Sequence, residues 1–154
     1  MILLLTGPIR SFKTTSLKSW ADARSDCGGV LSPDVEGLRH LYSVSSKELI
    51  PWQRKEVIAG DISIGRFAFD PLGFDKGALW MMQDLHQPHI NNIILDEVGL
   101  LELDGKGWDS LLKEMLPLLD QKTLILVVRD TLVDEVIEKY ELTDFSIVEK
   151  EYFM

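Results

Sequence analysis

Three residues near the start of the chain match the pattern of a loop that binds phosphate groups. The phosphate-loop (Walker A) template reads G-x-x-x-x-G-K-[ST], and Gly7, Lys13 and Thr14 occupy its first, seventh and eighth positions. In such a loop several backbone N–H groups point inward at phosphate oxygens, and the following helix adds the positive end of its dipole. The spacing therefore predicts a site for a nucleoside triphosphate.

The polar side chains of this pattern have defined roles in phosphate chemistry. We expect Lys13 to reach the β- and γ-phosphates as a point charge, which makes it both a binding and a catalytic candidate. We expect the Thr14 hydroxyl to bind Mg²⁺. The other residues of the segment are assigned to nucleotide binding through the loop that they form: Pro8, Ile9, Arg10, Ser11, Phe12 and Thr15.

Phe12 departs from the template, because it stands where the second glycine belongs. Glycine before the lysine leaves the backbone free to take unusual dihedral angles and to approach the phosphate closely. A phenylalanine must avoid positive φ or carry strain on the order of 1–3 kcal/mol. We expect its ring to face away from the phosphates and to pack on apolar neighbours of the loop or the helix. The alternative interpretation of the whole segment is a turn and helix start without a ligand.

A second motif, NNIILDEVG, supports the first. Ile93, Ile94 and Leu95 form an apolar run that fits a strand buried on both faces, and Asp96 and Glu97 follow at its carboxyl end. Ligands of open parallel sheets bind at that end. Asp96 is therefore the candidate that holds Mg²⁺, and Glu97 the candidate base that orients or deprotonates a water molecule. An apolar run followed by Asp-Glu is also an ordinary strand end, so the lysine upstream matters to this interpretation.

Arginines are the natural partners of a transferring phosphoryl group, whose charge spreads over several oxygens. Arg66 and Arg39 are candidates for contacts with the γ-phosphate. For both, a surface or sheet-edge position is the structural alternative. Arg129 also ends a predicted strand on the presumed ligand side.

These residues need a sheet that brings strand ends together, and the rest of the chain predicts one. Apolar runs and turn residues predict strands at 2–6, 28–32, 40–44, 48–52, 62–69 (broken near Gly65), 92–96, 123–128 and 145–149, and helical periodicity predicts helices at 13–24, 70–86, 108–119 and 131–140. The first strands after the phosphate loop predict an antiparallel β-meander beside the main sheet. The second half alternates strands and helices, which implies parallel strands with right-handed crossovers.

Composition bounds the class of protein. A chain of 154 residues predicts one domain, residues 1–154, with a real core. The formal net charge of −9 disfavours a nucleic-acid partner, because phosphate backbones need a basic face. The single cysteine, Cys27, allows no internal disulfide and favours a reducing, cytoplasmic compartment. The apolar start is too short for a signal peptide, and no segment approaches a membrane span, so no membrane partner is expected.

Taken in order, the motifs resemble the cancer-related nucleoside-triphosphatase family, small P-loop enzymes, over nearly the whole chain. The matching segments are 7–15, 29–34 with Arg39, 64–67 with Asp70, 74–76 with 78–79, and 95–99 with Glu102. The resemblance implies an α/β P-loop fold with a RecA-like, mostly parallel sheet flanked by helices and with added antiparallel strands. It also implies Mg²⁺-dependent hydrolysis of ATP, GTP and other nucleotides with broad base preference.

The chain departs from the family pattern at several positions. Phe12 replaces the loop glycine, and Leu100 replaces a lysine that usually follows Ile-Gly. Ser32 and Asp34 replace threonine and glutamate, which keeps their chemistry. Two alternatives to hydrolysis therefore remain. One is a nucleotide-binding module with little or no turnover because of Phe12, and the other is a small P-loop kinase that passes phosphate to a metabolite. The sequence predicts no particular protein partner.

Overall fold

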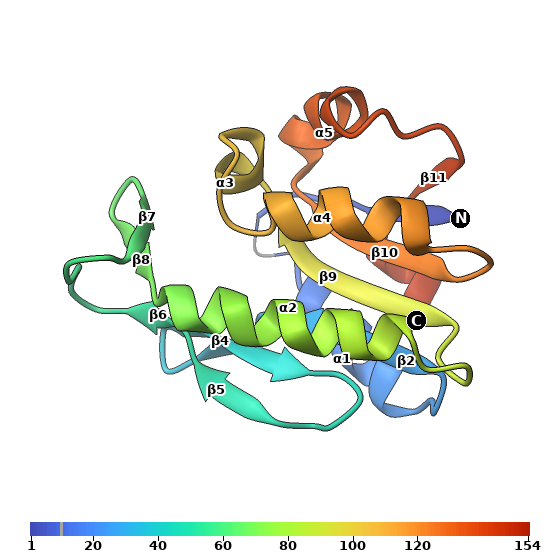
Figure 1. Ribbon diagram of the computed structural model, residues 1–154, viewed down its shortest axis with the longest axis horizontal. Helices are drawn as coiled ribbons and strands as arrows, with labels where there is room; N and C mark the ends of the chain where they lie inside the picture. Colours follow the sequence, from blue (N-terminus) through green and yellow to red (C-terminus); the bar gives the residue numbers. More distant parts are fainter. Residues whose placement is uncertain (10) are drawn as a thin grey trace.

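A computed structural model describes residues 1–9 and 11–154. Within these residues the chain forms a central sheet of eight strands, with helices on both faces, and a separate small sheet (Figure 1). The core of the central sheet consists of five parallel strands in the spatial order β11–β1–β10–β9–β2. Their bounds are β1 (Ile2–Leu5), β2 (Cys27–Leu31), β9 (Asn92–Val98), β10 (Thr123–Val128) and β11 (Phe145–Val148).

Antiparallel strands extend the sheet beyond β2. The strand β4 (Leu38–Ser43) pairs with β2 and with the two flanking strands β3 (Asp34–Val35) and β5 (Leu49–Pro51). The small sheet has the order β6–β8–β7, all antiparallel, with β6 (Gln53–Arg54), β7 (Ile62–Ile64) and β8 (Phe67–Phe69). The predicted meander is thus present, and it continues the main sheet.

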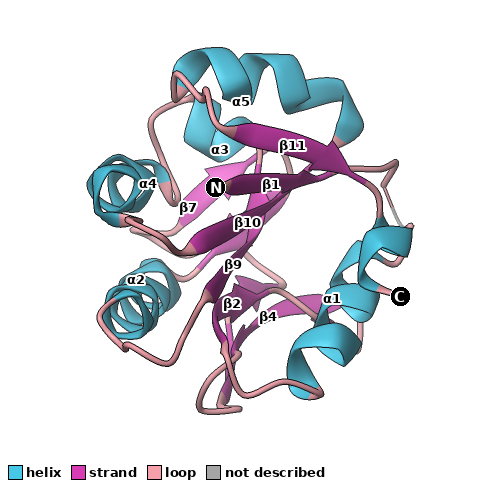
Figure 2. Cartoon of the chain, turned by 90° about the vertical axis from the view of Figure 1, so that its right-hand side faces the viewer, coloured by secondary structure: helices cyan, strands magenta, loops and turns pink. Residues whose placement is uncertain are grey.

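Helices cover the two faces of the sheet unequally. In Figure 2, α1 (Lys13–Asp22) lies on one face, and α2 (Pro71–Leu85) and α4 (Asp109–Met115) lie on the other. The remaining helices are α3 (Leu100–Leu103) and α5 (Val133–Lys139), and the 3-10 turns are η1 (Leu116–Leu118), η2 (Asp130–Leu132) and η3 (Lys150–Phe153).

Alternation along the strands produces two hydrophobic cores. In β1, Leu4 belongs to the core under α2, α4 and α5, whereas Leu3 and Leu5 belong to the core under α1. This is the period of two expected for a strand whose two faces are both covered. On the α1 side, Leu17 and Ala21 complete the core four residues apart, together with residues of β9 and β10.

Several predicted elements match the structure closely, and the exceptions are short. The predicted helix 70–86 corresponds to α2: Asp70 caps it by accepting a hydrogen bond from the Leu72 N–H at 3.0 Å, and Pro71 is its first residue. The predicted helix 108–119 ends early at Met115 and becomes a 3-10 turn around Pro117, because proline lacks the N–H that would continue the helix. The segment 62–69, predicted as a strand region broken near Gly65, forms the antiparallel β7–β8 hairpin, with its turn at Gly65 and Arg66. Four elements of two to four residues, β3, β6, α3 and η3, were not predicted.

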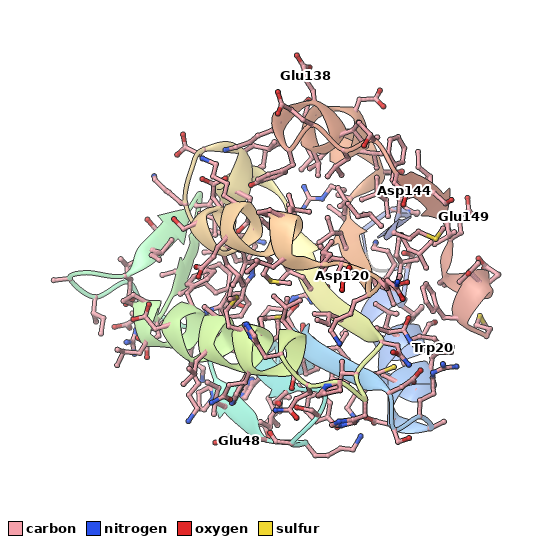
Figure 3. All side chains as sticks on the ribbon, turned by 45° about the vertical axis from the view of Figure 1, so that its right-hand side comes forward. Trp20, Glu48, Asp120, Glu138, Asp144 and Glu149 are labelled. Carbon is pink, nitrogen blue, oxygen red and sulfur yellow. The ribbon has the colours of Figure 1, made fainter. Side chains whose placement is uncertain are left out.

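Many of the chain's carboxylates lie on its outside, although Asp84, Asp96, Glu102 and Asp109 are buried. Figure 3 shows the labelled carboxylates Glu48, Asp120, Glu138, Asp144 and Glu149 projecting from the ribbon, and all five are exposed. Within the described residues, no helix has both the length and the apolar composition needed to cross a membrane.

Candidate functional site

The phosphate-loop segment connects β1 to α1 at the carboxyl edge of the parallel strands. Lys13 is the first residue of α1 and is only 9% exposed. Its Nζ donates hydrogen bonds to the carbonyl oxygens of Gly7 (3.1 Å) and Pro8 (2.8 Å) and to Ser11 Oγ (3.2 Å). Burial lowers the pKa of Lys13, and the nearby charge of Glu97 opposes that shift. The loop therefore wraps around the lysine ammonium group.

The two sequence motifs meet directly. Thr14 Oγ1 donates a hydrogen bond of 2.7 Å to Asp96 Oδ2, although the two residues are 82 positions apart. Asp96 is 1% exposed, and the same oxygen accepts a hydrogen bond from the Ser32 N–H at 3.0 Å. In the sheet β10 separates β1 from β9, but the carboxyl ends of all parallel strands lie at one edge. Asp96 is thus held by the start of α1 and the end of β2.

The donors at this point suit a hard divalent cation. A hydroxyl and a carboxylate oxygen 2.7 Å apart are the oxygen ligands that Mg²⁺ prefers. Among residues 1–9 and 11–154, no group of three or more His, Cys, Asp or Glu side chains could form a complete metal site. Proteins usually hold Mg²⁺ with one or two side chains and complete its shell with water and substrate phosphate. The residues present therefore fit Mg²⁺ bound together with a phosphate chain.

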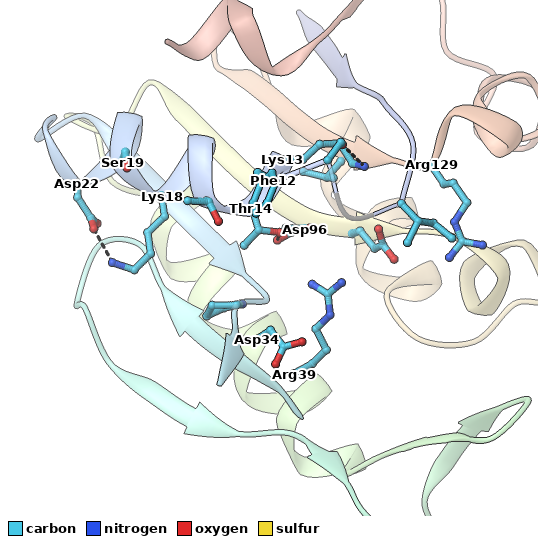
Figure 4. A pocket seen from close by; sticks show the side chains of 16 residues that line it. Phe12, Lys13, Thr14, Lys18, Ser19, Asp22, Asp34, Arg39, Asp96 and Arg129 are labelled. Carbon is cyan, nitrogen blue, oxygen red and sulfur yellow. Dashed lines mark hydrogen bonds and ion pairs between the residues drawn. The ribbon is translucent and has the colours of Figure 1, made fainter. Parts of the chain in front are cut away.

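Glu97 follows Asp96 and lines the same cavity. Desolvation raises the pKa of its carboxyl group, the charge of Asp96 adds to the shift, and Arg39 and Arg129 oppose it. Arg39 is fixed by a hydrogen bond of 2.7 Å from its Nη1 to the Ser32 carbonyl oxygen. In Figure 4, Arg39 approaches from the side of β4 and Arg129 from the end of β10. A carboxylate with a raised pKa and cations nearby can act as a base toward a bound water molecule.

These groups surround a cavity of about 620 Å³ at the carboxyl edge of the sheet (Figure 4). Ligand sites for small molecules commonly measure about 300–1,000 Å³. The cavity runs from the phosphate loop along α1 to Asp22, and the loop after β2 and the ends of β9 and β10 form its other walls. Its lining residues are Ile9, Ser11, Phe12, Lys13, Thr14, Thr15, Lys18, Ser19, Asp22, Pro33, Asp34, Arg39, Asp96, Glu97, Val127 and Arg129.

Phe12 adopts the backbone conformation that the template reserves for glycine. Its dihedral angles are φ 64° and ψ 29°, in the left-handed region, so it carries the predicted strain. The expectation that its ring packs on apolar neighbours is wrong, because the residue is 70% exposed. The buried stripe of α1 consists of Lys13, Leu17 and Ala21, and Phe12 precedes the helix outside that stripe. Phe12 instead lines the cavity, with Lys150 Nζ 5.6 Å from the centre of its ring.

The structure does not bring every candidate to the cavity. Arg66 is exposed in the turn between β7 and β8, where its guanidinium lies 5.3 Å from the centre of the Phe67 ring, and it does not line the cavity. The physical reason is that the segment forms a separate small sheet. Arg10 lies outside the described residues. Gly7 and Pro8 contribute to the site through their carbonyl oxygens, which accept hydrogen bonds from Lys13 Nζ.

Sequence reasoning missed part of the cavity wall. Lys18, Ser19 and Asp22 line it together with Thr14 and Thr15. The spacing i, i+1, i+4, i+5, i+8 puts these five residues on one face of a helix, and this signal was present in the sequence. Asp22 accepts a hydrogen bond from Lys18 at 2.7 Å, and Figure 4 shows this pair at the end of the cavity away from Lys13.

A second buried carboxylate lies close behind Glu97. Glu102 is 3% exposed and accepts hydrogen bonds from the N–H groups of Gly99 (2.8 Å) and Trp108 (2.9 Å). Burial raises its pKa to about 7, and the charge of Glu97 contributes to the shift. Through these bonds Glu102 fixes the backbone that follows Glu97.

Comparison with solved structures supports the fold. The crystal structure of THEP1 from the hyperthermophile Aquifex aeolicus superposes with a TM-score of 0.74 at 16% identity and covers 97% of this chain and 89% of its own. The solution structure of a human cancer-related nucleoside triphosphatase gives a TM-score of 0.68 at 18% identity, with coverages of 96% and 87%. No protein-family profile and no curated protein sequence matches the chain. These likenesses confirm the predicted α/β fold, with its mostly parallel sheet and added antiparallel strands.

Proposed function

We propose that this protein binds a nucleoside triphosphate, ATP or GTP with broad base preference, together with Mg²⁺, and hydrolyses it. The observation that carries the proposal is the hydrogen bond of 2.7 Å between Thr14 and Asp96. It joins the predicted phosphate loop to the predicted acidic strand end, next to the ammonium group of Lys13. The fold shared with a human nucleoside triphosphatase supports the same proposal.

In this proposal each group of the cavity has one task. The loop amides and Lys13 hold the β- and γ-phosphates, and Thr14 and Asp96 hold Mg²⁺. When bound, the cation would neutralise negative charge on the phosphate oxygens. Glu97 orients the attacking water molecule and accepts its proton, for which its raised pKa is suitable. Arg39 and Arg129 line the cavity near Glu97 and offer positive charge to the γ-phosphate.

The second candidate function is nucleotide binding with little turnover. The conformation of Phe12 and its position in the cavity wall are the observations that favour it. A side chain at φ 64° in the cavity wall stiffens the loop and limits how closely a phosphate can approach. A misplacement of about 1 Å can lower a rate on the order of 10²-fold. No observation on the described residues favours the kinase alternative.

Nucleotide binding and phosphate release, each with and without Mg²⁺, test the proposal. Lys13→Ala should weaken binding of Mg²⁺-ATP or Mg²⁺-GTP by about 1.5–3 kcal/mol, the range for a hydrogen bond to a charged group. The control is Lys55→Ala, which removes an exposed lysine that does not line the cavity. Equal affinity of the two variants would contradict the assignment of the loop. Binding without phosphate release would select the second candidate.

We extend the proposal to the chain as a whole. Residues 1–154 act as one nucleotide-binding domain, without a nucleic-acid or membrane partner. Cys27 is buried and its pKa is raised to about 11, mainly by desolvation, which fits an unreactive thiol in a reducing, cytoplasmic compartment.

A further inference from the structure

The last turn of the chain lies against the phosphate loop. The segment η3 packs on α1, where Phe153 is 4% exposed and meets the Trp20 ring edge-on with ring centres 5.0 Å apart. This packing brings Lys150 to the loop, from 139 residues away in the sequence. Figure 2 shows the C-terminus beside α1, on the face opposite α2 and α4.

Lys150 holds one particular peptide group of the loop. Its Nζ donates a hydrogen bond of 2.7 Å to the carbonyl oxygen of Ser11 and lies 5.6 Å from the centre of the Phe12 ring. In a trans peptide the carbonyl and the next N–H point in opposite directions, so fixing the Ser11 oxygen also fixes the Phe12 N–H. Among the described residues, no carboxylate lies within ion-pair distance of Lys150.

This peptide group is the one that most needs to be held. Phe12 is in the left-handed region, which disfavours any residue with a β-carbon, and its side chain makes no capping hydrogen bond to α1. Left to itself, the Ser11–Phe12 peptide would gain by rotating toward an unstrained conformation. A glycine at this position would have no such tendency.

We propose that Lys150 is a positioning residue of the phosphate loop, which holds the Ser11–Phe12 peptide so that the loop keeps its shape with phenylalanine in place of glycine. Lys13 fixes the loop from within through Gly7, Pro8 and Ser11 Oγ, and Lys150 fixes it from the C-terminal segment. The proposal rests on the proposed function for its effect on nucleotide binding, but its effect on the loop does not need a nucleotide.

The first test is hydrogen exchange of the nucleotide-free protein. Lys150→Met keeps the alkyl chain and removes the charge and the hydrogen bond. It should speed exchange of the Ser16 amide, whose N–H donates to the Phe12 carbonyl oxygen at 3.0 Å, by about 5- to 30-fold, since it releases the strained conformation at the start of α1. The matched control is Lys122→Met, because Lys122 Nζ also donates to a backbone carbonyl, that of Gln87 at 2.8 Å, away from the cavity. Unchanged exchange in Lys150→Met would overturn the proposal.

The second test measures whether Lys150 acts through Phe12 on Mg²⁺-ATP binding. Lys150→Met should weaken binding about tenfold in the wild-type background and less than threefold in a Phe12→Gly background, because glycine needs no support in the left-handed region. Lys150→Arg should restore most of the affinity, since it keeps the charge and donor hydrogens. An equal loss in both backgrounds would mean that Lys150 contacts the nucleotide itself, and the positioning role would be wrong. If the wild-type protein binds no nucleotide, the proposed function fails and the exchange experiment still decides the role of Lys150.

Discussion

Replacement of Phe12 by glycine gives a prediction whose size follows from the structure. Phe12 is 70% exposed, so removing its ring costs only about a third of the burial energy of a fully buried aromatic ring. That energy is about 1.5–3 kcal/mol, so the loss is roughly 0.5–1 kcal/mol. Glycine removes the left-handed strain of about 1–2 kcal/mol. It also costs about 0.5–1 kcal/mol in chain entropy. Phe12→Gly should therefore leave the free energy of unfolding within about 1 kcal/mol of wild type, a sum of these three.

Phe12→Ala separates the strain from the ring. This variant loses the same ring contacts but keeps a β-carbon at φ 64°, so the strain remains. We expect Phe12→Gly to be more stable than Phe12→Ala by about 0.5–1 kcal/mol, which corresponds to about 1–4 °C in Tm for a chain of this size. Nucleotide affinity of the glycine variant should equal or exceed that of wild type.

Thermal and urea unfolding of the three proteins, without nucleotide, provide the measurement. Phe12→Gly should have a larger free energy of unfolding than Phe12→Ala. If alanine is the more stable of the two, the left-handed strain at Phe12 is not a significant cost. If Phe12→Gly instead lowers the free energy of unfolding by several kcal/mol, the ring is buried in solution, contrary to the exposed position described above.

Other substitutions test the metal, the base and the pH response. Asp96→Asn should weaken Mg²⁺-dependent nucleotide binding at least tenfold while the Mg²⁺-independent part stays, and titration with and without the cation measures the difference; an unchanged Mg²⁺ dependence would move the cation site elsewhere. Glu97→Gln should slow phosphate release by about 10²–10⁴-fold with nucleotide affinity nearly unchanged, and turnover equal to wild type would assign the base to another residue. Because the folded-state pKa of Glu102 is raised from 4.5 to about 7, its contribution to stability is complete below pH 4.5 and is lost as the pH rises to about 7. From pH 4.5 to 7 the free energy of unfolding of wild type should therefore fall by up to about 3 kcal/mol more than that of Glu102→Gln. If urea unfolding gives the same pH dependence for both proteins, Glu102 does not have a raised pKa in the folded state.

The fold and the centre of the site could be predicted from sequence because their signals are local. Asp96 and Glu97 directly follow the apolar run 93–95, so one short segment predicts both a strand and the polar side chains at its end. Gly7, Lys13 and Thr14 likewise lie within one turn and helix start. Parallel strands follow from the alternation of strands and helices, and parallel strands place their carboxyl ends at one edge.

Only the tertiary structure decided which distant side chains reach that edge. Arg39 and Arg66 look alike in sequence, but β4 extends the main sheet and carries Arg39 to the cavity, whereas the β7–β8 hairpin leaves with Arg66 into a separate sheet. Phe12 shows the same limit. The template left two outcomes for its backbone, avoiding positive φ or bearing strain, and only the structure shows the left-handed one. Its exposure likewise depends on which face of α1 the sheet covers.

The sequence thus determined the residues whose chemistry matters and the strand ends that hold them, because pattern and spacing act over a few residues. The tertiary structure decided the cavity wall along α1, the separation of Arg66, and the bond from Lys150 to the loop. These depend on packing between segments far apart in the chain, where no local pattern states which side chains will meet.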